Sequence, residues 1–70
     1  MNKEKFNIYH WEFYIDYKDD DYTVYVYETR YCDVIGHLTN TKSLEEIENE
    51  LDGMSEDEVY NWIDNNIEYL

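Results

Sequence analysis

The chain has 70 residues, and its 18 Asp and Glu residues against 5 Lys and Arg give a formal net charge of −13. This charge excludes direct nucleic-acid binding by the usual route and binding to an anionic membrane surface, because both depend on Lys and Arg. We expect one domain over residues 1–70, and a chain of this length buries only about 60% of its unfolded surface. Nine Tyr, two Trp and two Phe argue against disorder and can supply a core.

The first predicted strand covers residues 7–17. Its side chains alternate between two sets, which is typical of a strand with one buried face. The face expected in the core carries Trp11, Phe13 and Ile15. The face expected in solvent carries His10, Glu12, Tyr14 and Asp16.

Two further strands are predicted over residues 22–29 and 31–38, after a polar turn at residues 18–21. In the second strand, Val24 and Val26 are expected on one face and Tyr25 and Tyr27 on the other. In the third, one apolar face is expected to carry Cys32, Val34 and Leu38. The short connections between the three strands predict an antiparallel meander.

The second half of the chain contains two capping boxes, in which a Ser and the Glu three residues later each bond the other's backbone amide. They are Ser43 with Glu46 and Ser55 with Glu58. They predict helices over residues 44–52 and 56–69, the second with an apolar stripe of Val59, Trp62, Ile63 and Leu70. The predicted fold is therefore α+β: a three-stranded antiparallel β-meander followed by two α-helices packed on one sheet face.

The acidic residues are unevenly distributed. Residues 43–70 contain ten Asp and Glu and no Lys or Arg, whereas residues 1–42 hold the other eight acids and all five bases. Acids near a helix N-terminus interact favourably with the helix dipole. An ordinary exposed helix also carries Lys for i,i+4 pairs, each worth roughly 0.3 kcal/mol. Because such pairs are missing, we expect a partner to supply the positive charge.

Carboxylates in a row on a helix are spaced much like nucleic-acid phosphates. Residues three or four apart on a helix have Cβ atoms about 5–6 Å apart, and phosphates advance about 3.4 Å per nucleotide along the axis of DNA. We therefore expect the acidic helices, extended by an acidic loop, to imitate the row of phosphates along a nucleic-acid strand. Tyr side chains between the acids would take the places of bases or sugars. The residues predicted to contact the partner are Asp19, Asp20, Asp21, Glu45, Glu48, Glu50, Asp52, Asp57, Asp64, Glu68, Tyr14 and Tyr25.

These features resemble those of small acidic phage-encoded DNA mimics, among them anti-CRISPR proteins, antirestriction proteins and uracil-DNA glycosylase inhibitors. The resemblance covers the whole chain in size, charge, aromatic content and β-plus-α layout. No sequence motif carries it, so no site residue is transferred from a family. The Pro-free composition, rich in Tyr, Asn, Ile and Asp, is also typical of an AT-rich genome such as that of a phage. The resemblance implies an anti-CRISPR protein that binds the basic DNA-reading channel of a CRISPR effector and excludes target DNA.

Two other functions fit the same sequence. An immunity protein or antitoxin that neutralises a basic nuclease would use the same acids. An acidic adaptor would instead bind through an uncovered, Tyr-rich sheet face, since Tyr is enriched at the centre of interfaces. Binding by such an adaptor would depend little on salt.

We expect no enzyme activity, no cofactor and no metal. Calcium loops beginning at Asp16 or Asp19 lack the required Gly and Glu, although loose cation binding at residues 19–21 stays an alternative. His10, Cys32 and His37 lack the spacing of a structural zinc site. The lone cysteine suits a reducing compartment, and no signal peptide or membrane-spanning stretch is evident, so we expect the cytoplasm of a bacterial host.

Overall fold

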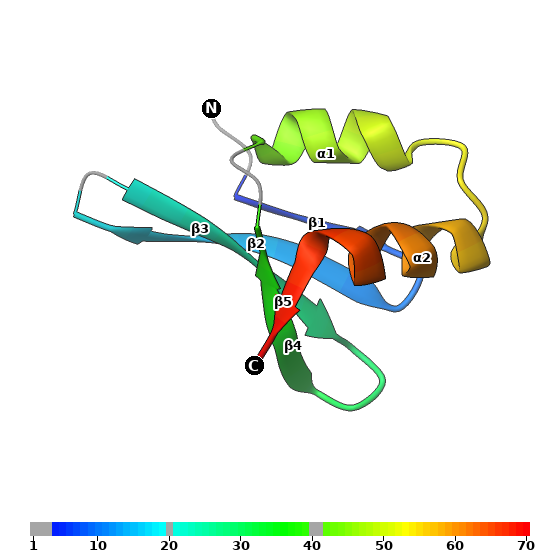
Figure 1. The fold of residues 1–70 in the computed structure, drawn as a ribbon, viewed down its shortest axis with the longest axis horizontal. Helices are drawn as coiled ribbons and strands as arrows, with labels where there is room; N and C mark the ends of the chain where they lie inside the picture. Colours follow the sequence, from blue (N-terminus) through cyan, green and yellow to red (C-terminus); the bar gives the residue numbers. More distant parts are fainter. Residues whose placement is uncertain (1–3, 20, 40–41) are drawn as a thin grey trace.

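Within the residues that the structure describes, 4–19, 21–39 and 42–70, the chain forms five β-strands and two α-helices (Figure 1). The structure is a computed structural model. Its elements are β1 (Lys5–Ile8), β2 (Trp11–Lys18), β3 (Asp21–Glu28), β4 (Asp33–Leu38), α1 (Leu44–Leu51), α2 (Glu56–Asn66) and β5 (Ile67–Tyr69). The strands form one antiparallel sheet in the order β1-β2-β3-β4-β5. The α+β class is confirmed, but the prediction of a three-stranded sheet was wrong.

The predicted first strand over residues 7–17 is a hairpin of β1 and β2. A two-residue turn, Tyr9 and His10, reverses the chain so that Phe6 pairs with Phe13. Tyr9 has a φ of 52°, a left-handed conformation that is uncommon for a bulky side chain. Its hydroxyl donates a hydrogen bond to the Met54 carbonyl at 2.6 Å, which ties the turn to the connection between α1 and α2. Because no Gly, Asn or Asp occupies this turn, the sequence did not indicate it.

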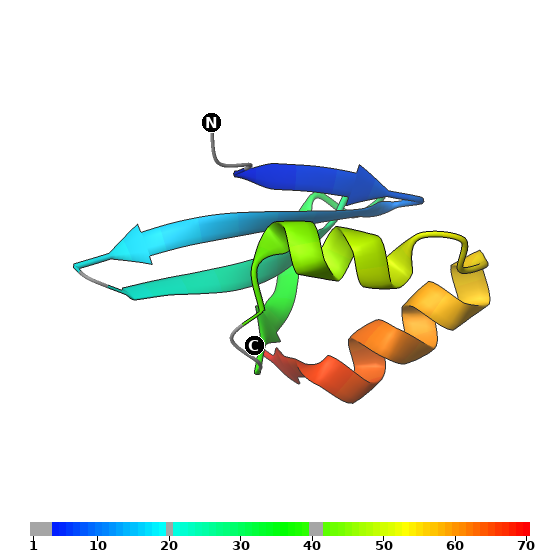
Figure 2. The same ribbon diagram turned by 90° about the horizontal axis from the view of Figure 1, so that it is seen from above.

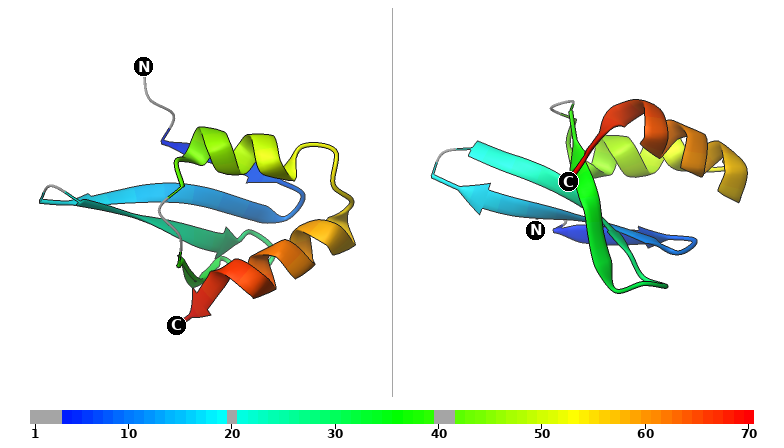
Figure 3. Two further views of the ribbon diagram at one scale, coloured as in Figure 1. Left: turned by 45° about the horizontal axis from the view of Figure 1, so that its top comes forward. Right: turned by 60° about the horizontal axis from the view of Figure 1, so that its bottom comes forward.

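The two eight-residue strands β2 and β3 form a long hairpin, and the predicted turn near residues 18–21 is confirmed. Lys18 pairs with Asp21 at the tip, where Asp19 has a φ of 57°. Asp20 lies outside the described residues. The tip extends away from both helices, as Figure 1 and the two views of Figure 3 show.

A bulge interrupts the pairing of β3 with β4. Val26 pairs with Gly36, whereas Tyr27 pairs with Val34, so Ile35 is an extra residue between them. A β-bulge of this kind bends the strand and changes which face the following side chains occupy.

The bulge and the preceding turn overturn the predicted face of the third strand. Leu38 is buried in the core, and Val34 lies on the opposite side of the sheet with Tyr27. Cys32 is not in the strand, because it occupies the β3–β4 turn with a φ of 51° and is exposed. The prediction that Cys32, Val34 and Leu38 share one face was wrong, since strict alternation cannot anticipate a bulge.

Both predicted capping boxes are present. The Ser43 Oγ accepts a hydrogen bond from the Glu46 amide at 3.2 Å, and the Ser55 Oγ accepts one from the Glu58 amide at 3.2 Å. Each Glu carboxylate accepts in return from the amide of its Ser. These reciprocal bonds satisfy backbone donors that a helix N-terminus leaves free, and they start both helices at the predicted residues.

The second helix is shorter than predicted and continues as β5. It ends at Asn66, whose side-chain amide donates a hydrogen bond to the Trp62 carbonyl at 2.8 Å. Ile67 is extended, with φ −112° and ψ 147°, and begins the strand that pairs with β4. The prediction of a helix over residues 56–69 was therefore wrong at its end. Leu70, predicted in the apolar stripe, is 79% exposed.

Gly36 makes room for β5. A Cβ atom added at this position would lie 2.3 Å from the Glu68 carbonyl oxygen and 2.9 Å from the side chain of Ile67. Such contacts are too short for any side chain, so β5 reaches its pairing distance only because residue 36 has none.

The two helices cover one face of the sheet (Figure 2). Trp11 and Trp62 are 4% and 9% exposed, as expected for core residues. The buried core consists of Phe6, Trp11, Phe13, Val24, Val26, Leu38, Leu44, Ile47, Leu51, Val59, Trp62 and Ile63. It draws on both helices and on the first four strands, so the opposite face of the sheet is left without a helical layer.

Candidate partner-binding surfaces

Two opposite surfaces hold most of the residues predicted to contact a partner. The first, here called the helix layer, consists of the acids of α1, α2 and the residue that caps the end of α1. All of them are exposed except Glu48, which is half-buried. Its members are Glu45, Glu46, Glu48, Glu50, Asp52, Glu56, Asp57, Glu58 and Asp64.

Several acids of the helix layer have no cation beside them. Glu45, Asp52 and Asp57 form no ion pair with any other described residue. Glu56 lies 3.3 Å from the His10 Nε2 atom, a group that is charged only when protonated. The helix layer therefore presents at least three exposed carboxylates that no described cation neutralises.

The second surface, here called the open face, is the side of the sheet opposite the core. One row of side chains crosses all five strands: Lys5 pairs with Tyr14, Tyr14 with Tyr25, Tyr25 with His37, and His37 with Glu68. The Tyr14 and Tyr25 rings stack with centroids 5.5 Å apart, and the His37 ring meets Tyr25 edge-on at 6.2 Å. Neighbouring rows add Glu12, Asp16, Thr23, Tyr27 and Val34.

The residues predicted to contact one partner do not form one surface. Tyr14, Tyr25 and Glu68 meet on the open face. Asp19 and Asp21 lie at the tip of the β2–β3 hairpin, and Asp20 is outside the described residues. The helix layer holds the remaining six: Glu45, Glu48, Glu50, Asp52, Asp57 and Asp64. Because the core and the sheet separate the helix layer from the open face, one flat partner surface cannot contact both.

Two acids of the helix layer accept side-chain hydrogen bonds that tie α1 and α2 to other parts of the fold. Glu50 accepts hydrogen bonds from the Lys42 ammonium and, at 3.0 Å, from the Trp62 Nε1 atom, and these two bonds lower the pKa of its carboxyl group. Asp64 accepts a hydrogen bond from the Tyr69 hydroxyl at 2.8 Å, which raises the pKa of Tyr69 to about 12. Both carboxylates therefore help to hold α2 and β5 in place as well as adding charge.

Glu28 is a buried carboxylate that sequence reasoning did not single out. It is 5% exposed and lies 2.8 Å from His10 Nδ1, while Arg30 donates to it from Nε, Nη2 and the backbone amide at 3.0–3.2 Å. Burial raises the pKa of this carboxyl, but the hydrogen bonds from Arg30 and His10 outweigh burial and lower it. Glu28 follows Val24 and Val26 at a spacing of two residues, and this period is the one sequence signal that places it on the core side.

His10 was predicted on the solvated sheet face, and that prediction was wrong. The turn between β1 and β2 places it at the edge of the helix-covered side, where it contacts Glu28 and lies against the Trp11 ring at 3.8 Å. Glu12, Tyr14 and Asp16 do lie on the uncovered face, as expected.

The candidate metal ligands are not gathered. Cys32 and His10 lie in two different turns, and His37 lies on the open face. Across the described part of the chain, no group of three or more His, Cys, Asp or Glu is arranged to hold a metal ion. Loose cation binding at residues 19–21 stays an untested alternative, because Asp20 lies outside the described residues.

None of the helices within the described ranges is both long and apolar enough to cross a membrane. Comparisons with protein-family models, with curated proteins and with solved structures find no match to this chain. The function is therefore inferred from the two surfaces themselves.

Proposed function

We propose that this protein is a non-enzymatic inhibitor that binds the basic nucleic-acid-binding surface of another protein through the helix layer. The observation that carries the proposal is the set of exposed acids in that layer that form no ion pair with another described residue. Glu45, Asp52 and Asp57 have no cation beside them in the described structure, and residues 43–70 include no Lys or Arg. A partner's Lys and Arg would relieve the repulsion among these acids.

A nucleic-acid-binding groove suits such a layer because its cations are already arranged to meet a row of negative charges. Binding therefore requires little reorganisation of the partner. Attraction between opposite charges also raises the rate of encounter at low salt. By occupying the groove, the protein excludes the nucleic acid that the groove normally holds.

Among such partners we favour a CRISPR effector, as the resemblance to anti-CRISPR proteins implies. The positively charged channel of such an effector holds a nucleic-acid duplex mainly through its backbone. The protein would act in the cytoplasm of a bacterial host, where its single, exposed cysteine stays reduced. A basic nuclease neutralised by an immunity protein or antitoxin would be bound in the same physical way.

The experiment is a displacement assay in which the protein competes with labelled target DNA for a guide-loaded Cas9-type effector. Two double variants change the net charge equally on opposite surfaces: Glu45→Lys with Asp57→Lys in the helix layer, and Glu12→Lys with Asp16→Lys on the open face. We expect the helix-layer variant to lose displacement and the open-face variant to retain it. Equal loss in both, or loss in the open-face variant alone, would contradict the proposal. No displacement by the unaltered protein would exclude the effector as partner, and the same variants would then be tested on a basic nuclease.

A second candidate function is that of an acidic adaptor which binds through the open face. The observation that favours it is the row from Lys5 to Glu68, in which Tyr14 and Tyr25 stack without any helix over them. Loss of partner binding in the open-face variant, with the helix-layer variant unaffected and little dependence on salt, would support this function.

A further inference from the structure

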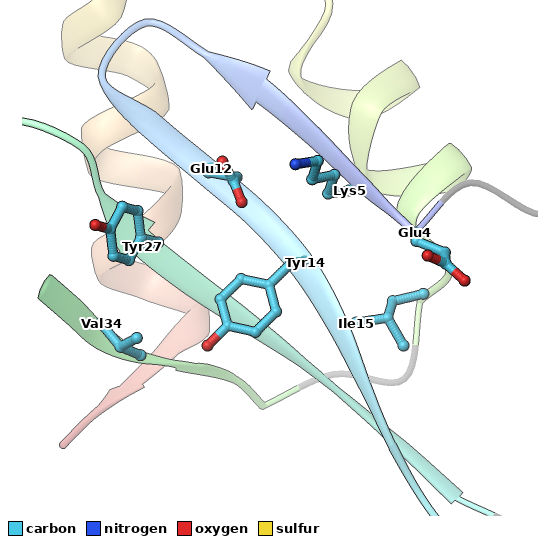
Figure 4. Close-up of a pocket in the computed structure, with 7 residues that line it drawn as sticks. All are labelled: Glu4, Lys5, Glu12, Tyr14, Ile15, Tyr27 and Val34. Carbon is cyan, nitrogen blue, oxygen red and sulfur yellow. The ribbon is translucent and has the colours of Figure 1, made fainter. Parts of the chain in front are cut away.

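The open face contains a depression beside the stacked Tyr14 and Tyr25 rings. Its volume is about 520 Å³. Figure 4 shows the side chains around it, which come from the chain before β1 and from β1, β2, β3 and β4. Its lining includes Glu4, Lys5, Glu12, Tyr14, Tyr27 and Val34.

A carboxylate lies next to two phenol rings in this depression. Glu12 is the cross-strand partner of Tyr27, and it lies two residues before Tyr14 on the same side of β2. Directly opposed residues in an antiparallel pair have Cβ atoms about 4.5–5.5 Å apart. All three side chains are half-buried, so the rings and the carboxylate are held by the sheet and still reach solvent. Val34, the partner of Tyr27 on β4, adds an apolar side.

The depression is negatively charged. Among the described residues that line it, Glu4 and Glu12 face one cation, Lys5, and Asp16 follows Tyr14 on the same side of β2. Burial and then the charges of Tyr25, Asp16 and Glu12 raise the pKa of Tyr14. Glu12 forms no ion pair with any other residue that the structure describes. An anion would be repelled here, and an apolar ligand would cover a carboxylate without giving it a partner.

We infer that this depression binds an arginine side chain presented by a protein partner. A planar guanidinium can lie on the face of a Tyr ring while donating two parallel hydrogen bonds to a carboxylate, here that of Glu12. The depression is wide and open, which suits a side chain projecting from a partner's surface. A second copy of this chain is a poor source, because its one arginine, Arg30, is bonded to Glu28 and the two copies would each carry a charge of −13.

The site lies on the opposite side of the sheet from the helix layer, so it does not depend on the proposed inhibition of a nucleic-acid-binding protein. It deepens only the second candidate function, since both use the open face. Binding of an arginine peptide to the depression can be measured without any effector or nucleic acid. Its failure therefore leaves the helix-layer proposal untouched.

The test is a titration of ¹⁵N-labelled protein with an acetylated, amidated pentapeptide, Gly-Gly-Arg-Gly-Gly, followed by NMR. We expect the amide signals of Glu12, Tyr14 and Tyr27 to shift together, and the same peptide with citrulline in place of arginine to bind at least about fivefold more weakly. Citrulline keeps the shape of the side chain but has no positive charge, so it loses the charge-assisted hydrogen bonds to the carboxylate. Equal binding of the two peptides, or shifts confined to α1 and α2, would overturn the inference. Shifts of the open-face amides on concentrating the protein alone would identify a second copy as the occupant and overturn it as well.

Five single variants sharpen the test. Glu12→Gln should weaken binding, and Tyr27→Leu should weaken it about two- to fivefold, whereas Tyr27→Phe, which keeps the ring, should bind like the unaltered protein. Lys5→Gln should strengthen binding, because it removes a competing cation from the lining of the depression. Glu45→Gln, an equal charge change on the helix layer, is the matched control and should have little effect. Weakening by Lys5→Gln, or equal weakening by Glu45→Gln and Glu12→Gln in variants whose spectra show an intact fold, would refute the site.

Discussion

Replacing Gly36 by alanine should detach β5 from the sheet. The added Cβ atom would lie 2.3 Å from the Glu68 carbonyl oxygen and 2.9 Å from the Ile67 side chain, and the first of these is a backbone atom that no rotamer change can move away. β5 pairs with β4 at three positions: Gly36 with Tyr69, His37 with Glu68, and Leu38 with Ile67. Relief of the clash therefore requires the whole strand to move.

The cost follows from the pairing that is lost. At a net contribution of about 1 kcal/mol for each backbone hydrogen bond, releasing this short strand costs about 2–3 kcal/mol. A 70-residue domain has a total stability of roughly 4–10 kcal/mol. For a domain of this size, the expected loss lowers the melting temperature by about 10–20 °C.

Thermal and urea denaturation of Gly36→Ala would measure this effect, and hydrogen exchange at β4 and β5 would locate it. The other glycine supplies a matched control. Gly53 has a φ of 82° with open space around it, so Gly53→Ala should cost only about 1 kcal/mol from its left-handed backbone. If Gly36→Ala were as stable as Gly53→Ala and kept slow hydrogen exchange in β5, the inference that β5 packs closely against Gly36 would be wrong.

Three further predictions concern side-chain contacts. Glu50→Ala should lower the free energy of unfolding by about 1–3 kcal/mol, because it leaves the buried indole N–H of Trp62 without an acceptor, and Glu50→Gln, which keeps one, should lose less. The pKa of Glu28 is lowered in the folded state, so its contribution to the free energy of unfolding is present above its ordinary pKa of 4.5 and is lost as the pH falls through the lowered value. The stability difference between the unaltered protein and Glu28→Gln should therefore shrink in acid. A constant difference from pH 7 to pH 3 would contradict this prediction. Ultraviolet titration should show Tyr69 ionising near pH 12, and Asp64→Asn should move that pKa down toward the usual 10.

The helices were largely predictable from the sequence because their signals are local. Each capping box specifies both the first residue of a helix and the hydrogen bonds that start it. The end of α2 was not predictable in this way. Asn66 closes the helix with a side-chain bond to Trp62, and the following residues turn into a strand only because β4 presents Gly36 to them. That partner is distant in sequence.

The sheet was predictable in its alternation but not in its number of strands. The turn at Tyr9 and His10 contains no residue typical of a turn. The hydrogen bond from the Tyr9 hydroxyl to the Met54 carbonyl joins positions 45 residues apart. The same turn moves His10 to Glu28. The bulge at Ile35 likewise depends on pairing with β3, which no local pattern reveals.

For the candidate site, the sequence identified acids and tyrosines but not their distribution over surfaces. Tyr14 and Tyr25 were both predicted to contact a partner, and the antiparallel register of β2 and β3 pairs them on one face, where their rings stack. The acids separate into the helix layer, the hairpin tip and the open face, which follows from the packing of the helices on the core side of the sheet. Charge composition alone contains no information on this separation.

The central claim is that the helix layer binds the positively charged side chains of a partner protein. The most direct measurement is the salt dependence of the complex with its nucleic-acid-binding partner, taken from about 0.1 M, where charges act over about 10 Å, to about 0.5 M, where screening reduces this to a few Å. We predict that affinity falls at least tenfold over this range and that the fall is smaller for the Glu45→Lys and Asp57→Lys double variant. An affinity that does not change with salt would contradict the claim.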